Sequence, residues 1–225
     1  MTPLALGIGV AFAVVGALSE RLASVWPPDE ASRRSAGWRT LAVALAAALA
    51  GWSIAARSTL PPWATGVYLL LLVPLVVLSA TDLEQRRLPH LVLDPLIVAA
   101  AAFVIVNPAV QPLNALIGAG TAIGFLGLLG LIIRAGVAMG DLYLVAPLGL
   151  MLGWPTIFVA VFLAALLSSV TSLALLATRR VGLKTYIPFG PFLVAGAVLA
   201  LVRDEHLLGP MSQAAAWIAH SLPWA

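Results

Sequence analysis

The chain has 225 residues, of which 62% are hydrophobic and 9% are charged, and it contains no cysteine. A soluble domain carries roughly 25% charged residues, and the mean hydropathy here is +1.06, so the composition excludes a water-soluble globular protein. The absence of cysteine excludes disulfides and Cys-based zinc sites. The net charge of +3 comes without a basic run interleaved with aromatic residues, so we expect no nucleic-acid partner.

Eight apolar runs follow one another along the chain, at residues 3–25, 39–56, 63–81, 91–106, 112–133, 142–153, 155–178 and 190–202. A hydrocarbon core of about 30 Å needs about 20 residues of helix. The fourth, sixth and eighth runs are shorter, so we expect them to tilt or to lie partly inside the bundle. No stretch alternates polar and apolar residues as a β-barrel would. The pattern predicts an all-α, polytopic transmembrane helix bundle of about eight spans.

The positions of Lys and Arg predict which side each loop faces. With the N-terminus outside, the inner loops hold ten of these residues and the outer loops hold only Arg57 and Arg203, in agreement with the positive-inside rule. The first run lacks the positive charges that begin a signal peptide, so we expect it to be retained. We expect a single membrane domain (1–225) in the cell inner membrane, with two spans and a short inner loop in 1–59, a core in 60–202 and a tail in 203–225.

Two aspartates stand at matching depths of the predicted bundle. Asp82 directly follows the third apolar run and Asp141 directly precedes the sixth, so both are expected on the cytoplasmic side. Two carboxyl groups held close together share one proton, so the ionised group can activate water while the protonated group donates to a carbonyl oxygen. The spacing alone leaves two interpretations open: a proteolytic pair, or aspartates that only cap the ends of helices.

The other acids near the inner face have simpler explanations. Asp94, followed by Pro95, suits the N-cap of a helix. Glu20 is expected to form an ion pair with the neighbouring Arg21, and Glu84 is expected to be a solvated loop acid or to attract a basic peptide. The candidate site therefore consists of Asp82 and Asp141.

Three short motifs lie at predicted cytoplasmic loops. Residues 81–89 are Thr-Asp-Leu-Glu-Gln-Arg-Arg-Leu-Pro, residues 138–141 are Ala-Met-Gly-Asp, and residues 187–192 are Ile-Pro-Phe-Gly-Pro-Phe. The first resembles the Asp-Leu signature of type IV prepilin peptidases, and the second resembles their Gly-x-Gly-Asp motif, which presenilin-like proteases also carry. The third is similar to the stretch before the last span of the family. The resemblance covers about residues 60–201.

The resemblance implies an intramembrane aspartyl endopeptidase that cleaves the leader of prepilin-like precursors on the cytoplasmic face, with Asp82 and Asp141 as the catalytic pair and without metal or cofactor. Such precursors would carry a short basic leader, cut after a small residue, usually glycine, before a hydrophobic transmembrane segment. The expected partners are these precursors, the lipid bilayer and other pilus or secretion components. The residues expected to shape the substrate site are Ala138, Met139, Gly140, Pro188, Gly190 and Pro191, and those expected to anchor the first loop are Arg86, Arg87 and Pro89.

The sequence departs from the family pattern at several places. Ala138 replaces the first glycine of Gly-x-Gly-Asp, Tyr143 stands where a lysine is usual, and His90 stands where Asn or Asp is common. The predicted inner loop at residues 26–38 holds none of the cysteines of the classical insert, which implies a short, peptidase-only form. An inactive scaffold of a pilus or secretion machine is therefore an alternative, as is a small transporter whose inward-facing acids relay protons.

Overall fold

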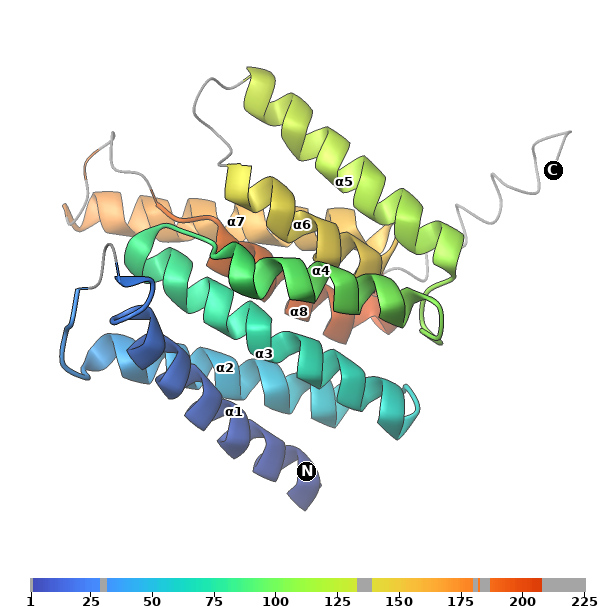
Figure 1. Cartoon of the computed structure of the whole chain (residues 1–225), viewed down its shortest axis with the longest axis horizontal. Helices are drawn as coiled ribbons and strands as arrows, with labels where there is room; N and C mark the ends of the chain where they lie inside the picture. The colour runs from blue at the N-terminus through green and yellow to red at the C-terminus, as the bar shows by residue number, and fades with distance from the viewer. Residues whose placement is uncertain (1, 29–31, 133–138, 180–181, 183–186, 208–225) are drawn as a thin grey trace, which may run out of the picture.

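The fold is a bundle of helices that run roughly along one common direction (Figure 1). The computed structural model describes residues 2–28, 32–132, 139–179, 182 and 187–207. The helices are α1 (Pro3–Ala23), α2 (Trp38–Arg57), α3 (Pro62–Gln85), α4 (His90–Val104), α5 (Pro112–Ile132), α6 (Met139–Leu152), α7 (Thr156–Ala177) and α8 (Gly190–Leu207). No strand occurs in these described ranges, so the predicted all-α class is confirmed there.

Five of the helices, α1, α2, α3, α5 and α7, are long and apolar enough to cross a bilayer. The other three, α4, α6 and the Gly190–Val202 part of α8, are apolar but shorter. The chain is therefore a multi-pass membrane protein, as the sequence predicted. The number of crossings and the side on which the N-terminus lies stay predictions.

Several helix boundaries differ from those that the apolar runs predicted, and α8 continues to Leu207 rather than ending near residue 202. α3 continues to Gln85, about one turn past residue 81, and α6 begins at Met139, before residue 142. α4 begins at His90, so that Asp94 lies inside the helix and pairs with His90 across one turn at 3.0 Å. Asp94 is therefore not the N-cap of α4, and that prediction is wrong.

The short helix α6 lies at the centre of the bundle. Nine of its 14 residues are buried, and it contacts α4, α5, α7 and α8. The hairpin of α1 and α2 packs against α3 on one side of this centre, and α5 lies on the opposite side (Figure 1). Because protein rather than lipid surrounds α6, this helix can be shorter than the hydrocarbon core is thick.

Glycines set how closely neighbouring helices approach. A Cβ atom added to Gly149 of α6 would lie 2.5 Å from the Cα atom of Ala119 in α5, and one added to Gly16 of α1 would lie 2.7 Å from a carbonyl oxygen of α2. Helices in lipid pack through such small residues because their backbones can then touch. On α5, Gly120 and Gly124 have no neighbouring atom within 4 Å of an added Cβ, so α5 is held to the described bundle through one face only.

Candidate active site

Asp82 lies in the last turn of α3 rather than after the helix. α3 ends at Gln85 and is capped by Arg86, whose backbone is left-handed with φ 55° and whose N–H donates to the carbonyl oxygen of Asp82 at 2.9 Å. The side chain of Asp82 points into the protein, because the residue is only 5% exposed. A buried carboxylate needs hydrogen-bond donors, and the backbone N–H of Gly190 donates to its Oδ2 at 3.0 Å.

Asp141 lies in the first turn of α6 and is 3% exposed. A negative charge at this position is favoured by the partial positive charge of the helix N-terminus. The carboxylate of Asp141 interacts electrostatically with that of Asp82, so the structure brings together the two acids that the sequence placed at matching depth. Among the described residues no three His, Asp or Glu side chains group closely enough to hold a metal ion.

Gly190, the first residue of α8, lies between Asp82 and α6. A Cβ atom at this position would lie 2.7 Å from Asp82 Oδ2 and 3.4 Å from Leu144 Cδ2, so a side chain here would push against the carboxylate. Pro191 follows, and a proline is tolerated at the beginning of a helix because the first N–H groups have no partner within the helix. The glycine therefore lets the N-terminus of α8 bind Asp82 directly.

Two residues of the Gly-x-Gly-Asp-like motif, Met139 and Gly140, precede Asp141 at the beginning of α6. A Cβ atom on Gly140 would lie 3.1 Å from Leu88 Cδ1, so this glycine allows α6 to approach the connection between α3 and α4. Met139 is 69% exposed and does not enter the bundle. Ala138 lies outside the described residues.

The prolines and arginines predicted around the site lie at its edge. Pro188 and Pro191 are half-buried on either side of the buried Gly190. Pro89 precedes α4, and its carbonyl oxygen accepts two N–H groups from the first turn of that helix at 3.0 and 3.1 Å. Arg86 and Arg87 are exposed, in agreement with a position at the surface of the bundle.

Comparison with known proteins identifies the family. Residues 69–173 match the type IV leader peptidase family. The prepilin leader peptidase/N-methyltransferase of Aeromonas hydrophila is 32% identical over 163 residues, which cover 69% of this chain and 56% of the relative. The protein of the same name from Bacillus subtilis is 27% identical over 134 residues, which cover 60% of this chain and 54% of the relative. The one from Burkholderia pseudomallei is 30% identical over 132 residues, which cover 56% of this chain and 43% of the relative. The chain belongs to the type IV leader peptidase family.

The match to the type IV leader peptidase family covers only part of each protein. The chain spans about half the length of the curated relatives that it matches, 54% and 56% for the first two. No solved structure matches the chain. Both aspartates fall inside the matched range 69–173, whereas Gly190 falls beyond it.

Two of the residues that depart from the type IV leader peptidase pattern contact each other. The rings of His90 and Tyr143 pack edge to face, with their centroids 5.2 Å apart. Tyr143 follows Asp141 by two positions and is 45% exposed. The contact joins the beginnings of α4 and α6 beside the candidate site, so the two replacements form one local unit.

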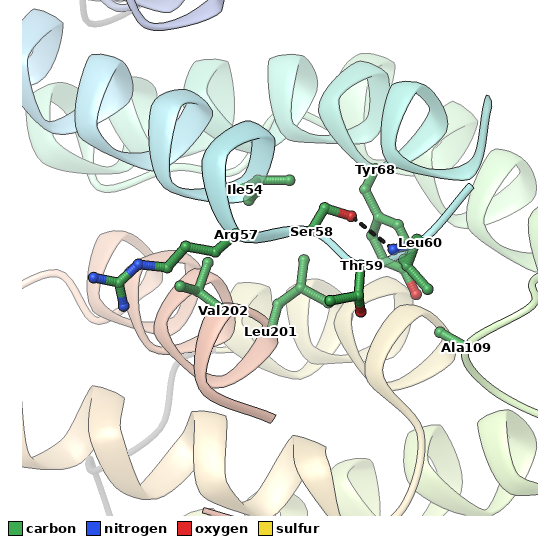
Figure 2. A pocket seen from close by; sticks show the side chains of 9 residues that line it. All are labelled: Ile54, Arg57, Ser58, Thr59, Leu60, Tyr68, Ala109, Leu201 and Val202. Carbon is green, nitrogen blue, oxygen red and sulfur yellow. Dashed lines mark hydrogen bonds between the residues drawn. The ribbon is translucent and has the colours of Figure 1, made fainter. Parts of the chain in front are cut away.

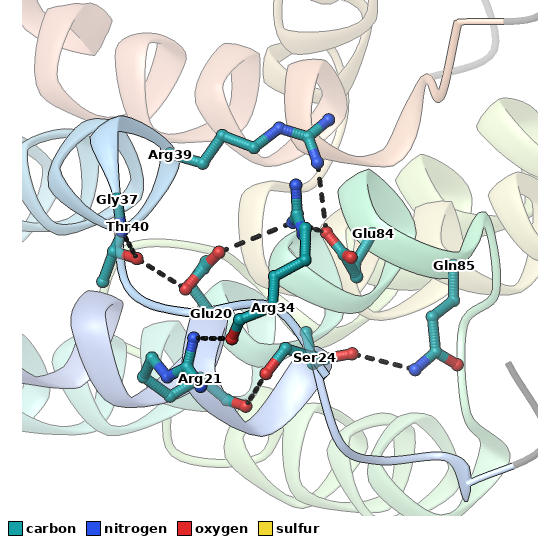
Figure 3. Close-up of polar contacts among 10 residues, drawn as sticks. Glu20, Arg21, Ser24, Arg34, Gly37, Arg39, Thr40, Glu84 and Gln85 are labelled. Carbon is teal, nitrogen blue, oxygen red and sulfur yellow. Dashed lines mark hydrogen bonds and ion pairs between the residues drawn. The ribbon is translucent and has the colours of Figure 1, made fainter. Parts of the chain in front are cut away.

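A polar cluster that the sequence did not predict lies next to the Asp82 turn (Figure 3). It consists of Glu20, Arg34, Arg39, Thr40, Glu84 and Gln85. The side chain of Glu84 is 7% exposed and forms ion pairs with Arg34 and, at 3.2 Å, with Arg39. Glu84 is therefore neither a solvated loop acid nor an accessible attractor of basic peptides, and both of those predictions are wrong.

The same polar cluster fastens the connection between α1 and α2 to the end of α3. Glu20 accepts the hydroxyl of Thr40 at 2.7 Å and lies 3.6 Å from Arg34. Arg21 instead donates to the carbonyl oxygen of Arg34 at 2.5 Å, so the predicted Glu20–Arg21 pair is wrong. Gln85 donates to the carbonyl oxygen of Ala23, the last residue of α1, at 2.8 Å and to that of Pro27 in the connection at 3.1 Å. These contacts fix the end of the helix that carries Asp82.

A small cavity lies at the other end of α3 (Figure 2). Its volume is about 110 Å³, and Arg57, Tyr68 and Val202 contribute to its walls. The hydroxyl of Tyr68 donates to the carbonyl oxygen of Met151 at 2.9 Å. At 1.5 Å of rise per residue, Tyr68 and Asp82 are about 21 Å apart along the helix, so this cavity does not belong to the candidate site.

Proposed function

We propose that this chain is an intramembrane aspartyl endopeptidase that cleaves the leader of prepilin-like precursors at the cytoplasmic face of the inner membrane. One observation carries the proposal. Asp82 and Asp141, two buried carboxylates from separate helices, interact with each other within the range that matches the type IV leader peptidase family. Burying two acids beside each other is costly for stability, so a purely structural role explains the pair poorly.

In the proposed topology all eight helices cross the membrane and the N-terminus lies outside. The end of α3 and the beginnings of α6 and α8 then lie at the cytoplasmic face. The polar cluster supports this orientation, because Arg34 and Arg39 lie at the same end of the bundle as Asp82, and basic residues favour the cytoplasmic side. Residues 1–59 would form a first hairpin, 60–202 the peptidase core and 203–225 a tail of one membrane domain.

The proposed reaction uses two carboxyl groups that share one proton. The ionised carboxylate takes a proton from water while the water oxygen attacks the carbonyl carbon of the scissile peptide bond, and the protonated carboxyl group donates its proton to the carbonyl oxygen. When the C–N bond breaks, the leaving nitrogen takes the proton that came from water, and the tetrahedral hydroxyl returns its proton to the other carboxylate. The N–H of Gly190 holds Oδ2 of Asp82, which keeps that carboxylate oriented.

We propose the peptidase reaction alone for this chain. The relatives are named for both leader cleavage and N-methylation, but the connection between α1 and α2 is short and contains no cysteine. The substrates would carry a basic leader, a small residue before the cut and an apolar segment after it, and other pilus or secretion components would be partners. The residues proposed to shape the site are Ala138, Met139, Gly140, Pro188, Gly190 and Pro191, and those proposed to anchor the first loop are Arg86, Arg87 and Pro89.

The test compares Asp82→Asn and Asp141→Asn with the wild-type protein, each co-expressed with a prepilin-like precursor. Asp94→Asn is the matched control, because the Asp94 side chain is 65% exposed and pairs with His90 outside the candidate pair. Removing a catalytic group lowers the rate by roughly a thousandfold or more, so we expect the first two variants to leave the precursor uncut while the control cuts it normally.

Cleavage at the wild-type rate by Asp141→Asn would show that the mechanism is wrong. A precursor that keeps its full length in the presence of the wild-type protein, together with loss of pilus assembly when the gene is deleted, would support the inactive scaffold instead.

A further inference from the structure

A groove that is open to the lipid lies between α5 and α7. Its volume is about 590 Å³, and apart from two serines of α7 its walls are apolar. Phe125 and Leu129 of α5 form one wall, Phe162 and Ala165 of α7 form the other, and Phe189 closes the groove toward the bundle. None of the described residues that line it is charged, which favours an apolar occupant.

Helices α5 and α7, which flank the groove, diverge toward the end of the bundle that holds the aspartates (Figure 1). α5 and α7 are in contact through the rings of Phe125 and Phe158, whose centroids are 5.6 Å apart. Beyond this contact the end of α5 at Ile132 diverges from α7, on the side where α6 begins (Figure 1). The helices thus form a V whose open end faces the first turn of α6, which carries Asp141.

Two consecutive residues place one edge of the groove close to the candidate active site. Phe189 lines the groove, and the next residue, Gly190, donates its N–H to Oδ2 of Asp82 at 3.0 Å. An elongated occupant of the groove therefore has one of its ends beside the aspartates. Because the flanking helices are both long and apolar enough to cross a bilayer, a peptide occupant must satisfy its own backbone hydrogen bonds, which in lipid requires a helix.

From this geometry we infer that the groove between α5 and α7 receives the apolar helix of the precursor, the segment that directly follows the cleavage site. The inference rests on the proposed function. With the apolar helix in the groove, the N-terminal end of that helix lies at the open end of the V, and the peptide bond before it lies next to Asp82 and Asp141. The basic leader then extends toward the cytoplasmic face, away from the apolar walls.

Photocrosslinking in lipid bilayers tests the position of the occupant. Phe162, which is 67% exposed and lines the groove, is replaced by p-benzoylphenylalanine, and Val170, which is 60% exposed on another face of α7, is replaced in the same way as the matched control. The probe is a precursor with a basic leader ending in glycine before an apolar helix. We expect position 162, but not position 170, to form an adduct with the apolar helix of the precursor.

Filling the groove tests its role in cleavage. Ala165→Trp places an indole between the two walls, whereas Val170→Trp adds the same indole outside the groove. Since burial of one large apolar side chain changes binding by roughly ten- to hundredfold, we expect Ala165→Trp to lower kcat/KM for the precursor by that factor and Val170→Trp to leave it unchanged.

The two proposals fail in different ways. If the wild-type protein cleaves the precursor but position 162 forms adducts only with lipid, or no more than position 170 does, the groove is not the docking site and the proposed function stands. Equal cleavage by Ala165→Trp and Val170→Trp leads to the same conclusion. If the wild-type protein does not cleave the precursor, the proposed function fails and the inference about the groove fails with it.

Discussion

Replacing Gly190 by alanine is the most informative single change in this protein. The new Cβ atom would lie 2.7 Å from Oδ2 of Asp82 and 3.3 Å from its Cγ, whereas ordinary van der Waals contact begins near 3.4 Å. The carboxylate must therefore move by several tenths of an ångström. It is held inside the protein at 5% exposure, so the displacement breaks or bends the hydrogen bond from the N–H of residue 190.

The expected loss follows from that hydrogen bond. A hydrogen bond to a charged group contributes about 1.5–3 kcal/mol, which corresponds to roughly a ten- to hundredfold fall in kcat. The backbone of Gly190 is not in the left-handed region, so alanine causes no backbone strain and the helical fold is expected to persist. The effect is thus on the rate of cleavage far more than on the amount of folded protein.

The assay measures kcat for leader cleavage of a prepilin-like precursor together with the thermal unfolding of the purified protein. Gly66→Ala is the matched control, because Gly66 lies on the same helix as Asp82 and an added Cβ there has no neighbouring atom within 4 Å. If Gly190→Ala and Gly66→Ala cleave at the same rate, the contact between α8 and Asp82 has no catalytic importance.

Three further changes test the packing and the polar cluster. Arg34→Ala removes one of the two ion pairs of the buried Glu84 side chain and is expected to lower the free energy of unfolding by about 1–3 kcal/mol. The partial exposure of Arg34 limits this loss, and an unchanged unfolding temperature would contradict the expectation. Gly149→Ala forces α6 away from α5 and should lower the free energy of unfolding by about 1–3 kcal/mol. Gly124→Ala adds a Cβ atom with no neighbouring atom within 4 Å and should lower it far less in the same assay. Tyr68→Phe leaves a carbonyl oxygen of α6 without its donor and should lower the free energy of unfolding by about 1–2 kcal/mol, while kcat stays at the wild-type value. A fall in kcat would show that the far end of α3 is coupled to the aspartates.

The apolar runs predicted the helices well but not where the polar ends of the helices lie. α3 continues past its apolar run because Glu84 and Gln85 find partners in the connection between α1 and α2. Those partners are far away in sequence, and hydropathy carries no information about them. The start of α4 was misplaced for a local reason: Pro89 already provides the carbonyl that begins the helix, so Pro95 falls inside it.

The sequence pointed to the two acids that the structure buries, but not to the way in which the candidate site is built around them. The positions of Asp82 and Asp141 relative to the apolar runs, and the motifs around them, were sufficient to select both. The Ile-Pro-Phe-Gly-Pro stretch was noticed, but the physical need for glycine at residue 190 depends on the approach of α8 to Asp82, which joins segments more than a hundred residues apart. The burial of Glu84 likewise depends on Arg34, fifty residues earlier in the chain.

The way in which the first connection returns to the bundle has a consequence for how the protein can be enlarged. The N–H of Arg33 donates to the carbonyl oxygen of Ser24 at 2.8 Å, so the chain re-enters beside the point where it left α1. With both ends of this loop held by the fold, extra residues inserted between 28 and 32 cost chiefly chain entropy, about 0.6 kcal/mol for each doubling of loop length. A whole additional domain could be accommodated at this point without rearranging a single transmembrane helix.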